Sequence, residues 1–567
     1  MVAFGNDSMT APRHSIWKVP VSSHWKFVLL PLAVIFIIIT FGIFLFWQAT
    51  IDDAYISARY AKNLVKGFGL VFNRGERVEG FSNPIWVIFL SIGEYLALPS
   101  IFVAKCIGAI SALACIPYII WTWHKLKINI VISIPVILLF VAQPSLWLWS
   151  VAGLETVFYA LVMSMAIVSA GFEAQNTSKF SRSALLCGIA AMIRPEGIAL
   201  LGVIIVTKLA GGLISASKTR MIRSIFGSIF IFAITVGPYI VFRRIYYESW
   251  LPNTYFAKTG AVVNISSGFH YLMHSFNSPA GIALLCLAVP TGIYQSKKSP
   301  VVLGLFLGLV TQVSFTIWTG GDWMPLGRYI VPLLPVATIL AGIGISSAAG
   351  FWNEHEMHPH LFSLFKFACI AVPLLFQVPY IYRAYGDYYW RLSRGLESRA
   401  ALGLWMSKNL NENFTIAYGD AGMLAYKSML PLLDMNGLVD KRIAQIRHNY
   451  FSQNIRDSIE AQYIVDRRPS MIILVTRDHP DKIWFPVDYG KELVNNSSFH
   501  TYFQQAGYLI AYPPKKVPAY PTGRFLVFFA RRDVLISGFQ RILCCINQAI
   551  STDQDPQQAC LSSSAEQ

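Results

Sequence analysis

The chain has 567 residues, of which 54% are hydrophobic and only 13% are charged, and its mean hydropathy is +0.49. A soluble domain carries about 25% charged residues, so this composition excludes an ordinary soluble protein. Apolar runs recur along most of the chain, and a helix needs about 20 such residues to cross a bilayer. The net charge of +16 comes from basic residues in short loops between these runs. That pattern is typical of membrane orientation and does not indicate a nucleic-acid partner.

The first apolar run, Phe27–Trp47, predicts a membrane span that is retained in the mature protein. It is too long for the core of a signal peptide, and no small-residue cleavage site follows it. The segment before it, residues 1–25, is basic and is therefore expected in the cytoplasm. The span would then end at the outer face, immediately before Asp52 and Asp53.

The stretch from Pro84 to Trp123 is long enough for two spans, but two spans would place Lys125 and Lys127 outside, against the charge bias. We therefore expect an interfacial or re-entrant helix over Pro84–Leu98 and one span over Ile101–Trp123. The same rule predicts about eleven spans in all. The other nine are Ile128–Val141, Thr156–Ala170, Ala184–Ile193, Ile198–Leu209, Ser224–Val241, Ala280–Tyr294, Val301–Trp318, Tyr329–Ile345 and Leu361–Ile381.

The composition changes after Tyr382, where charge rises and short apolar segments alternate with helical patterns. This predicts a soluble α/β domain on the outer side, with the C-terminus outside. Its expected strands are Phe414–Ala417, Met471–Val475 and Phe525–Phe529, and its expected amphipathic helix is Leu402–Leu410. The predicted domains are a cytoplasmic segment 1–25, a transmembrane domain 26–382 with a first outer loop 49–100, an α/β domain 383–535, and a C-terminal helix with a disordered tail 536–567.

Three cysteines near the C-terminus, Cys544, Cys545 and Cys560, could form one disulfide if that end is outside. The polar tail from Ser551 on is expected to be disordered. No paired CxxC motif is present, so a structural zinc site is not expected.

The loops were assigned to the two sides of the membrane from their lysines and arginines alone. With that assignment, all the polar, glycine-rich motifs fall on the outer face. Function is therefore expected there, where loops from many spans can converge. These motifs are Asp52-Asp53-Ala-Tyr-Ile-Ser-Ala-Arg59-Tyr60, Gly153-Leu-Glu155, Arg194-Pro-Glu196, Leu251-Pro-Asn253-Thr-Tyr255-Phe-Ala-Lys258 and Gly320-Gly-Asp322-Trp323.

Asp52 and Asp53 are the leading catalytic candidates. Carboxylates at a membrane boundary are costly unless they meet water, a cation or a partner. Two neighbouring carboxylates repel, so one pKa can rise towards values suited to a general base. The alternative is a solvated helix start, since aspartate favours N-caps, and a helix over Ala54–Lys66 fits that alternative.

The other candidates each have a structural alternative. Arg59 could hold the carboxylates or a phosphate, or be a helix surface charge. Arg194 and Glu196 could bind substrate or form an ion pair that braces the bundle. Lys258, beside Tyr255, suits an anionic headgroup, but a snorkelling lysine is equally simple. The Asp322–Trp323 pair ends a span, where Trp323 alone would be an ordinary interface aromatic.

The first-loop motif from Asp52, with Gly69-Leu-Val-Phe-Asn73 and Gly75-Glu-Arg-Val-Glu-Gly80-Phe-Ser-Asn83 after it, resembles the first outer loop of the mycobacterial terminal arabinofuranosyltransferases. Those are membrane glycosyltransferases of the GT-C fold. The later outer motifs, with Arg328-Tyr329, Tyr418-Gly-Asp420-Ala-Gly422 and Asp434-Met-Asn-Gly437-Leu-Val-Asp440, are similar to family motifs in the same order. The resemblance covers roughly residues 25 to 530. Phe81 stands where a tyrosine is expected, which is a mild departure.

The resemblance implies an inverting transfer of a sugar from a polyprenyl-phosphate donor to an envelope glycan or glycolipid hydroxyl. It places the reaction at the outer, periplasmic face of the bacterial cytoplasmic membrane. Asp52 or Asp53 would take the proton, with Asp52 favoured. Lys258, Arg59, Arg194 or Arg328 would hold the phosphate, with Lys258 and Arg59 favoured. Glu155, Glu196, Asn253, Tyr255, Asp322 and Trp323 complete the expected substrate site. No cofactor is expected, although the sequence does not exclude a divalent metal at the carboxylates.

Two other functions compete with this interpretation. A transporter or flippase would show charges along a central pathway and two symmetric halves, neither of which is evident. A non-catalytic scaffold for envelope assembly would use the C-terminal domain as its binding module and would not need the acidic pair.

Overall fold

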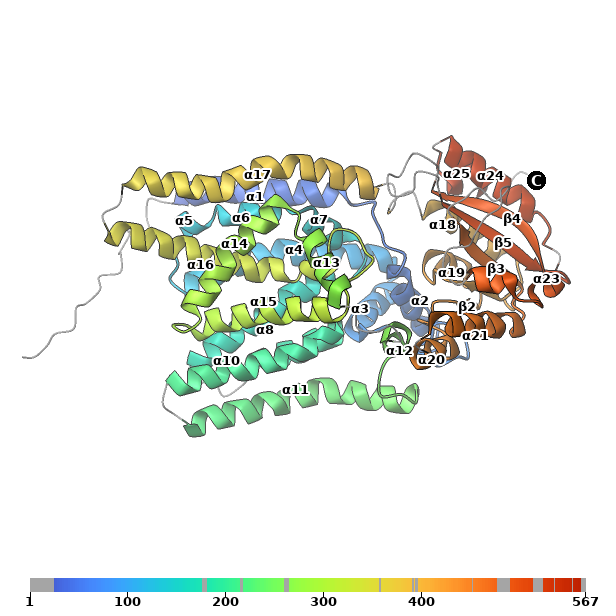
Figure 1. Cartoon of the computed structure of the whole chain (residues 1–567), viewed down its shortest axis with the longest axis horizontal. Coiled ribbons are helices and arrows are strands. Elements are labelled where there is room, and N and C mark those ends of the chain that lie inside the picture. Colours follow the sequence, from blue (N-terminus) through green and yellow to red (C-terminus); the bar gives the residue numbers. More distant parts are fainter. Residues whose placement is uncertain are drawn as a thin grey trace, which may run out of the picture.

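The computed structural model describes residues 25–175, 181–214, 218–259, 265–355, 358–389, 392, 396–450, 452–476, 490–512, 524–534, 536–552 and 554–561. Two parts lie side by side along the long axis of the molecule, a helical bundle and a smaller sheet domain (Figure 1). The predicted cytoplasmic segment lies outside the described residues except for Trp25.

The bundle is built from the apolar runs that the sequence predicts. Its long helices are α1 (Trp25–Leu45), α4 (Ser100–Lys125), α8 (Thr156–Gln175), α10 (Leu200–Ile214), α11 (Lys218–Tyr246), α14 (Pro279–Gln295), α15 (Pro300–Trp318), α16 (Leu333–Glu354) and α17 (Pro359–Tyr389). Its shorter elements are α2 (Ala54–Val65), α3 (Pro84–Tyr95), α5 (Ile130–Ser133), α6 (Val136–Val141), α7 (Pro144–Val151), α9 (Arg182–Ile193), η1 (Pro195–Ala199), α12 (Asn253–Thr259), α13 (Ile265–Ser275) and η2 (Arg328–Ile330).

Seven helices in the described ranges are long and apolar enough to cross a membrane, or up to nine if each of two bent pairs forms one span. The bends are 63° between α6 and α7 and 109° between α13 and α14, and each lies just before a helix-starting proline. These nine coincide with nine predicted spans. The other two predicted spans correspond to Leu29–Leu45 of α1 and to α9, which are shorter apolar helices. The polytopic helical class is therefore confirmed, while the count of eleven stays a prediction.

The C-terminal domain holds a five-stranded mixed sheet in the order β2-β1-β3-β5-β4. The first three strands are parallel and the last pairings are antiparallel. The strands are β1 (Ile416–Tyr418), β2 (Leu432–Asp434), β3 (Met471–Thr476), β4 (Phe503–Tyr512) and β5 (Arg524–Arg531). The helices are α18 (Glu397–Asn409), α19 (Met423–Ser428), α20 (Lys441–Asn449), α21 (Gln453–Asp466), α22 (Gly490–Asn495), α23 (Phe499–Tyr502), α24 (Phe539–Ser551) and α25 (Pro556–Leu561).

Alternate strand residues pack on opposite faces of this sheet, as the two-residue period of a strand requires. Ile472 and Val527 face a core that α20, α21, α22 and α23 cover. Ile473 and Phe528 face a second core, which contains α18, α19 and α24. That second core also includes Tyr60 from α2, together with Phe72, Phe81 and Trp86 from the first outer loop. The sheet domain and the first outer loop therefore share one hydrophobic core.

The end of the chain differs from the prediction. The α/β domain does not stop at residue 535, because α24 and α25 pack onto the same sheet face and onto α18. The segment after Ser551, expected to be disordered, contains α25, which a Cys545–Cys560 disulfide joins to α24. Cys544 is free and exposed. A cross-link of this kind can order a polar segment that has too few apolar residues to pack alone.

Cys560→Ser is expected to lower the free energy of unfolding of the sheet domain by about 2–3 kcal/mol, because the disulfide closes a short loop. Thermal unfolding of the two proteins, with and without reductant, measures the difference. Cys544→Ser is the matched control and should unfold like the parent protein. Equal melting temperatures for Cys560→Ser and Cys544→Ser would contradict the prediction.

Candidate functional site

Asp52 lies between the end of α1 and the start of α2, and its carboxylate is held by the sheet domain. Its two oxygens accept hydrogen bonds from the backbone N–H groups of Gly422 and Met423, each at 2.9 Å. These N–H groups begin α19, so the carboxylate caps a helix of the other domain. Gly422 is required here, because a β-carbon at that position would overlap the backbone and carboxylate oxygens of Asp52. Both carboxylate oxygens of Asp52 therefore serve a structural contact.

A second acidic side chain, Asp420, lies beside Asp52. Arg399 pairs with Asp420 at 3.1 Å, and the Tyr418 hydroxyl donates to the same carboxylate at 2.8 Å. Desolvation opposes ionisation of Asp420, but Arg399 and Arg524 hold its pKa below the usual value. Desolvation, and then the charge of Asp420, raise the pKa of Asp52 to about 7, while Arg399 and the Met423 N–H oppose that rise.

Asp53 has a different environment from Asp52. Its side chain forms no hydrogen bond or ion pair with any residue that the structure describes, and it is half-buried. Desolvation raises its pKa, while the nearby charges of Lys258 and then Arg328 lower it, and Asp322 and Asp420 raise it. Asp53 thus lies in a mixed electrostatic field with its oxygens available. The sequence favoured Asp52 as the base, whereas this geometry favours Asp53.

The two cations near Asp53 differ in accessibility. Arg328, in η2, is buried and pairs with Asp322 at 3.0 Å. Lys258, on α12, is exposed and makes no hydrogen bond or ion pair within the part of the chain that the structure describes. An exposed lysine opposite an accessible carboxylate can accept an anion without first losing a partner.

A chain of buried polar side chains extends from α2 into the bundle. Ser57 donates to Asn83 at 3.2 Å, and Asn83 donates to Glu155 at 2.8 Å. Arg194 pairs with the other Glu155 oxygen at 3.2 Å and also with Glu196. All five side chains are less than a tenth exposed. Of the two interpretations of Arg194 and Glu196, the structure has the ion pair, and that pair excludes Arg194 as a free phosphate ligand.

Arg59 does not have the phosphate-binding role that the sequence suggested. It is 2% exposed, and its guanidinium donates to the carbonyl oxygens of Phe72, Ala425 and Leu430 at 2.7–2.9 Å. It also stacks over the Phe72 ring, 4.2 Å from the centroid. Arg59 therefore joins the first outer loop to the sheet domain, because buried carbonyl groups need donors.

Asn253 also differs from its expected role. It is buried, and its Nδ2 donates to the carbonyl oxygens of Gly437, Leu438 and Asp440 at 2.8–3.3 Å. Its backbone N–H donates to the Glu79 carbonyl at 3.0 Å. The Asn253 side chain is thus a bond between α12 and the sheet domain and is not available to substrate.

The remaining candidates lie at the surface of this region. Trp323 is 66% exposed and Tyr255 is 40% exposed. Tyr255 is on α12, three residues before Lys258, so both can lie on one face of that helix. Either ring could stack against a sugar, and each is also suited to a membrane interface.

Three residues that form buried contacts around the site were missing from the prediction, namely Glu79, Asp420 and Arg399. Glu79 is buried and accepts hydrogen bonds from Tyr239 at 2.6 Å and Arg243 at 2.5 Å, which joins the first outer loop to α11. Asp420 and Glu79 both occur in the motifs that carry the family resemblance, so a signal for them existed. Arg399 had no local signal, because its role depends on a partner from another element.

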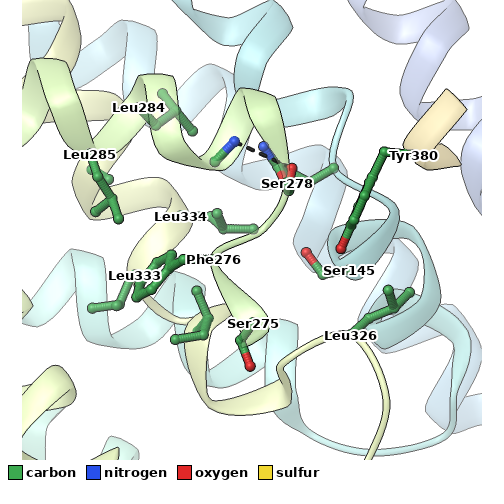
Figure 2. A pocket seen from close by; sticks show the side chains of 14 residues that line it. Ser145, Ser275, Phe276, Ser278, Leu284, Leu285, Leu326, Leu333, Leu334 and Tyr380 are labelled. Atoms are coloured by element: carbon green, nitrogen blue, oxygen red, sulfur yellow. Dashed lines mark hydrogen bonds between the residues drawn. The ribbon is translucent and has the colours of Figure 1, made fainter. Parts of the chain in front are cut away.

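A mostly apolar cavity adjoins η2, at the bend between α13 and α14 (Figure 2). Leu326 and Ile330 line it on either side of Arg328 in sequence. Ser145 and Ser275 supply hydroxyl groups (Figure 2). At its edge, Ser278 hydrogen-bonds with Gln143 at 2.8 Å, between the two bent helix pairs. The residues that line the cavity therefore come both from the segment around Arg328 and from the helices α14 and α16 of the bundle.

No group of three or more histidine, cysteine, aspartate or glutamate side chains in a metal-binding arrangement occurs among the described residues. The absence of a metal requirement stays a prediction.

Comparison with known proteins supports the resemblance seen in the sequence. Residues 387–526 match a family described as "Domain of unknown function (DUF8728)". The chain is 27% identical over 342 residues to a terminal beta-(1->2)-arabinofuranosyltransferase of Mycobacterium tuberculosis (strain ATCC 25618 / H37Rv), covering 52% of each chain. It is 25% identical over 376 residues to the protein of the same name from Corynebacterium glutamicum, covering 56% of this chain and 52% of the relative. The chain spans about half the length of these curated relatives.

The fold is also similar to that of solved structures. ArnT from Cupriavidus metallidurans bound to undecaprenyl phosphate aligns with a TM-score of 0.52 at 14% identity, covering 89% of this chain and 98% of ArnT. Its apo form aligns with a TM-score of 0.53 over the same shares. The chain therefore has the GT-C fold, which it shares with ArnT. Its sequence is similar to the terminal arabinofuranosyltransferases, as predicted.

Arg59→Lys is expected to destabilise the docked sheet domain by about 3 kcal/mol, because a lysine cannot reach three separate carbonyl groups and leaves buried acceptors unpaired. Thermal unfolding and limited proteolysis measure the loss. Arg74→Lys is the control, since Arg74 forms an exposed pair with Glu412 and should change stability by less than about 1 kcal/mol. If Arg59→Lys were as stable as the control, the structural role of Arg59 would be wrong.

Proposed function

We propose that this chain is a membrane glycosyltransferase that moves a sugar from a polyprenyl-phosphate donor to a hydroxyl of an envelope glycan or glycolipid. The observation that carries the proposal is the accessible Asp53 carboxylate beside Lys258 and Arg328, in a bundle of the GT-C fold. A general base and cations for a phosphate are the two requirements of such a transfer. The likeness to arabinofuranosyltransferases supports a pentofuranose as the first sugar to test.

In the proposed reaction, Asp53 takes the proton of the acceptor hydroxyl as its oxygen attacks the anomeric carbon. The bond between that carbon and the phosphate oxygen breaks, so polyprenyl phosphate leaves and the configuration at the anomeric carbon is inverted. Lys258 balances the charge that develops on the phosphate, and Arg328 adds to the positive field although Asp322 partly neutralises it. Asp53 then returns its proton to solvent.

The apolar side chains that line the pocket beside η2 suit the isoprenoid end of the donor. A phosphate held near Lys258 and Arg328 would leave the first isoprene units close to Leu326 and Ile330, which line that cavity. ArnT, which shares the fold, was solved with undecaprenyl phosphate, and this supports a donor of the same class. An apolar surface is needed because each buried methylene group contributes about 0.8 kcal/mol.

The proposed site faces the periplasm. The basic loops at Lys127 and Lys297 contact the second half of α16, where Asn129 and Gln295 hydrogen-bond with Ser346 and Ser347. Arg328 precedes the other end of α16, which at 1.5 Å per residue spans about 33 Å. Basic loops favour the cytoplasmic side, and the Cys545–Cys560 disulfide favours an oxidising compartment for the sheet domain. Both features support an active site on the outer side.

Asp53→Asn is expected to lower the transfer rate by about 10²–10⁴-fold without loss of stability, because it removes a base whose charge burial already disfavours. Asp52→Asn is its matched control. It replaces one acceptor oxygen by a donor and should loosen the contact with α19, so its activity should fall together with its stability. Glycan analysis of the host envelope and thermal unfolding measure the two effects.

The opposite result, an active Asp53→Asn protein and an inactive but stable Asp52→Asn protein, would reverse the assignment of the base. Unchanged envelope glycans in both variants would overturn the glycosyltransferase proposal and favour the envelope-assembly scaffold.

Lys258→Ala is expected to move the acid limb of the pH profile of kcat/KM to higher pH. Asp53 must be ionised to accept a proton, and Lys258 lowers its raised pKa. Without that cation the pKa of Asp53 rises further, so a higher pH is needed for the same ionised fraction. Lys258→Arg keeps the charge and should keep the limb in place. An acid limb that stays unmoved in Lys258→Ala would show that Lys258 does not act on the base.

A further inference from the structure

The two groups proposed to act on substrate come from distant parts of the chain. Asp53 follows the first span, and Lys258 lies on α12, about 200 residues later. Within the described residues, neither side chain is held by a hydrogen bond of its own. Their separation must therefore be set by the residues that hold the segments on which they lie.

The sheet domain holds the first of these segments through Asp52. The Gly422 and Met423 N–H groups bind the Asp52 carboxylate, which directly precedes Asp53. Arg399 and Asp420 lie on the same side and brace this turn by their own ion pair. We call the contact between Asp52 and the Gly422–Met423 turn the first clamp.

The same domain holds the second segment through Asn253. The loop from Asp434 to Asp440 presents three carbonyl oxygens to Asn253 Nδ2, at 2.8–3.3 Å. The loop is shaped from within, since the Asp434 carboxylate accepts the N–H groups of Asn436 and Val439, both at 2.9 Å. Asn253 is the first residue of α12, and Lys258 is five residues further on. This contact is the second clamp.

The sheet domain does not need these clamps to stay docked against the helical bundle. The shared apolar core of Tyr60, Phe72, Phe81 and the sheet already holds the domain against the first outer loop. Apolar contact is not directional, whereas hydrogen bonds to fixed backbone groups define position. The clamps therefore add orientation to a contact that is already stable.

We propose that the sheet domain, which matches a family described only as of unknown function, is an orienting domain that sets the distance between Asp53 and Lys258 through these two clamps. Asp52, Gly422 and Asn253 are then positioning residues. The proposal rests on the glycosyltransferase function proposed above. An error of about 1 Å in such a distance can lower a rate by 10²-fold, so the effect is large enough to measure.

The test uses the full chain purified into lipid nanodiscs, with undecaprenyl phosphate as the binding probe and envelope glycan transfer as the activity. Asn253→Ala should weaken undecaprenyl phosphate binding by about tenfold and move the acid limb of the pH profile upwards, as Lys258→Ala does. Gly422→Ala should lower kcat by at least about tenfold and leave undecaprenyl phosphate affinity within about twofold. A tenfold change corresponds to about 1.4 kcal/mol, which is comparable to the loss of one charge-assisted hydrogen bond.

The charged groups near Asp53 are the adjacent Asp52, Lys258 on α12, Arg328 in η2, Asp322 before it and Asp420 after β1. None of the test variants replaces Arg328, Asp322 or Asp420. A shift of the acid limb of the pH profile in Asn253→Ala therefore reports on the position of Lys258 relative to Asp53.

Asn547→Ala is the matched control for Asn253→Ala. Asn547 also bonds backbone groups, those of Tyr508 and Ile510, but only within the sheet domain. It should lower thermal stability and leave both readouts unchanged. Because Asn253→Ala could reduce the folded yield, Asn253→Asp, which keeps the shape and cannot donate, is measured beside it on the monodisperse fraction.

The outcomes separate the two proposals. If Asn253→Ala and Gly422→Ala match Asn547→Ala in probe binding, kcat and acid limb, the orienting role is wrong even when Asp53→Asn is inactive. If Asp53→Asn and Asp52→Asn both remain active and Lys258→Ala binds undecaprenyl phosphate normally, the proposed function itself fails. A split in which Asn253→Ala changes binding and Gly422→Ala changes kcat supports the orienting role, because a general loss of stability would move both together.

Discussion

The contact between the Asp52 carboxylate and the start of α19 is the constraint on which the rest of the site depends. A carboxylate at a membrane boundary is costly without partners, and here two backbone N–H groups of a separate domain supply them. The contact holds the segment between α1 and α2, just before α2 begins. It also leaves Asp53 with free oxygens, since neighbouring residues at a helix start project in different directions.

Most of the buried charges in this region are balanced by a partner of opposite charge. Arg194 is neutralised by Glu155 and Glu196, and Arg328 by Asp322, so most buried charges have partners. Buried pairs of this kind define geometry more than they add stability. Asp53 and Lys258 differ from them, because their side chains form no hydrogen bond or ion pair with any residue that the structure describes. The paired charges hold the bundle, and we propose that Asp53 and Lys258 serve the substrate.

The predicted elements were those with a strong local pattern. The helix Ala54–Lys66, the short helix after Pro84 and the strands at Met471 and Phe525 appear within a few residues of their predicted bounds. Strand β2 was missed because three residues give no alternation, and β4 because its first half carries two adjacent glutamines. Helix α25 was missed because its order comes with a disulfide to α24 and not from an apolar pattern of its own.

Span length and loop charge are local properties, so the sequence alone was enough to predict a polytopic membrane protein, and it favours the outer face as the place of function. It also determined which segments to examine, through the motif that begins at Asp52. Only the tertiary structure decided the roles within that list. Arg59 and Asn253 became bonds between domains because carbonyl groups from residues 425–440 surround them. Asp53 differs from Asp52 for a similar reason, since the Gly422 N–H, 370 residues further along the chain, binds the Asp52 carboxylate and not that of Asp53.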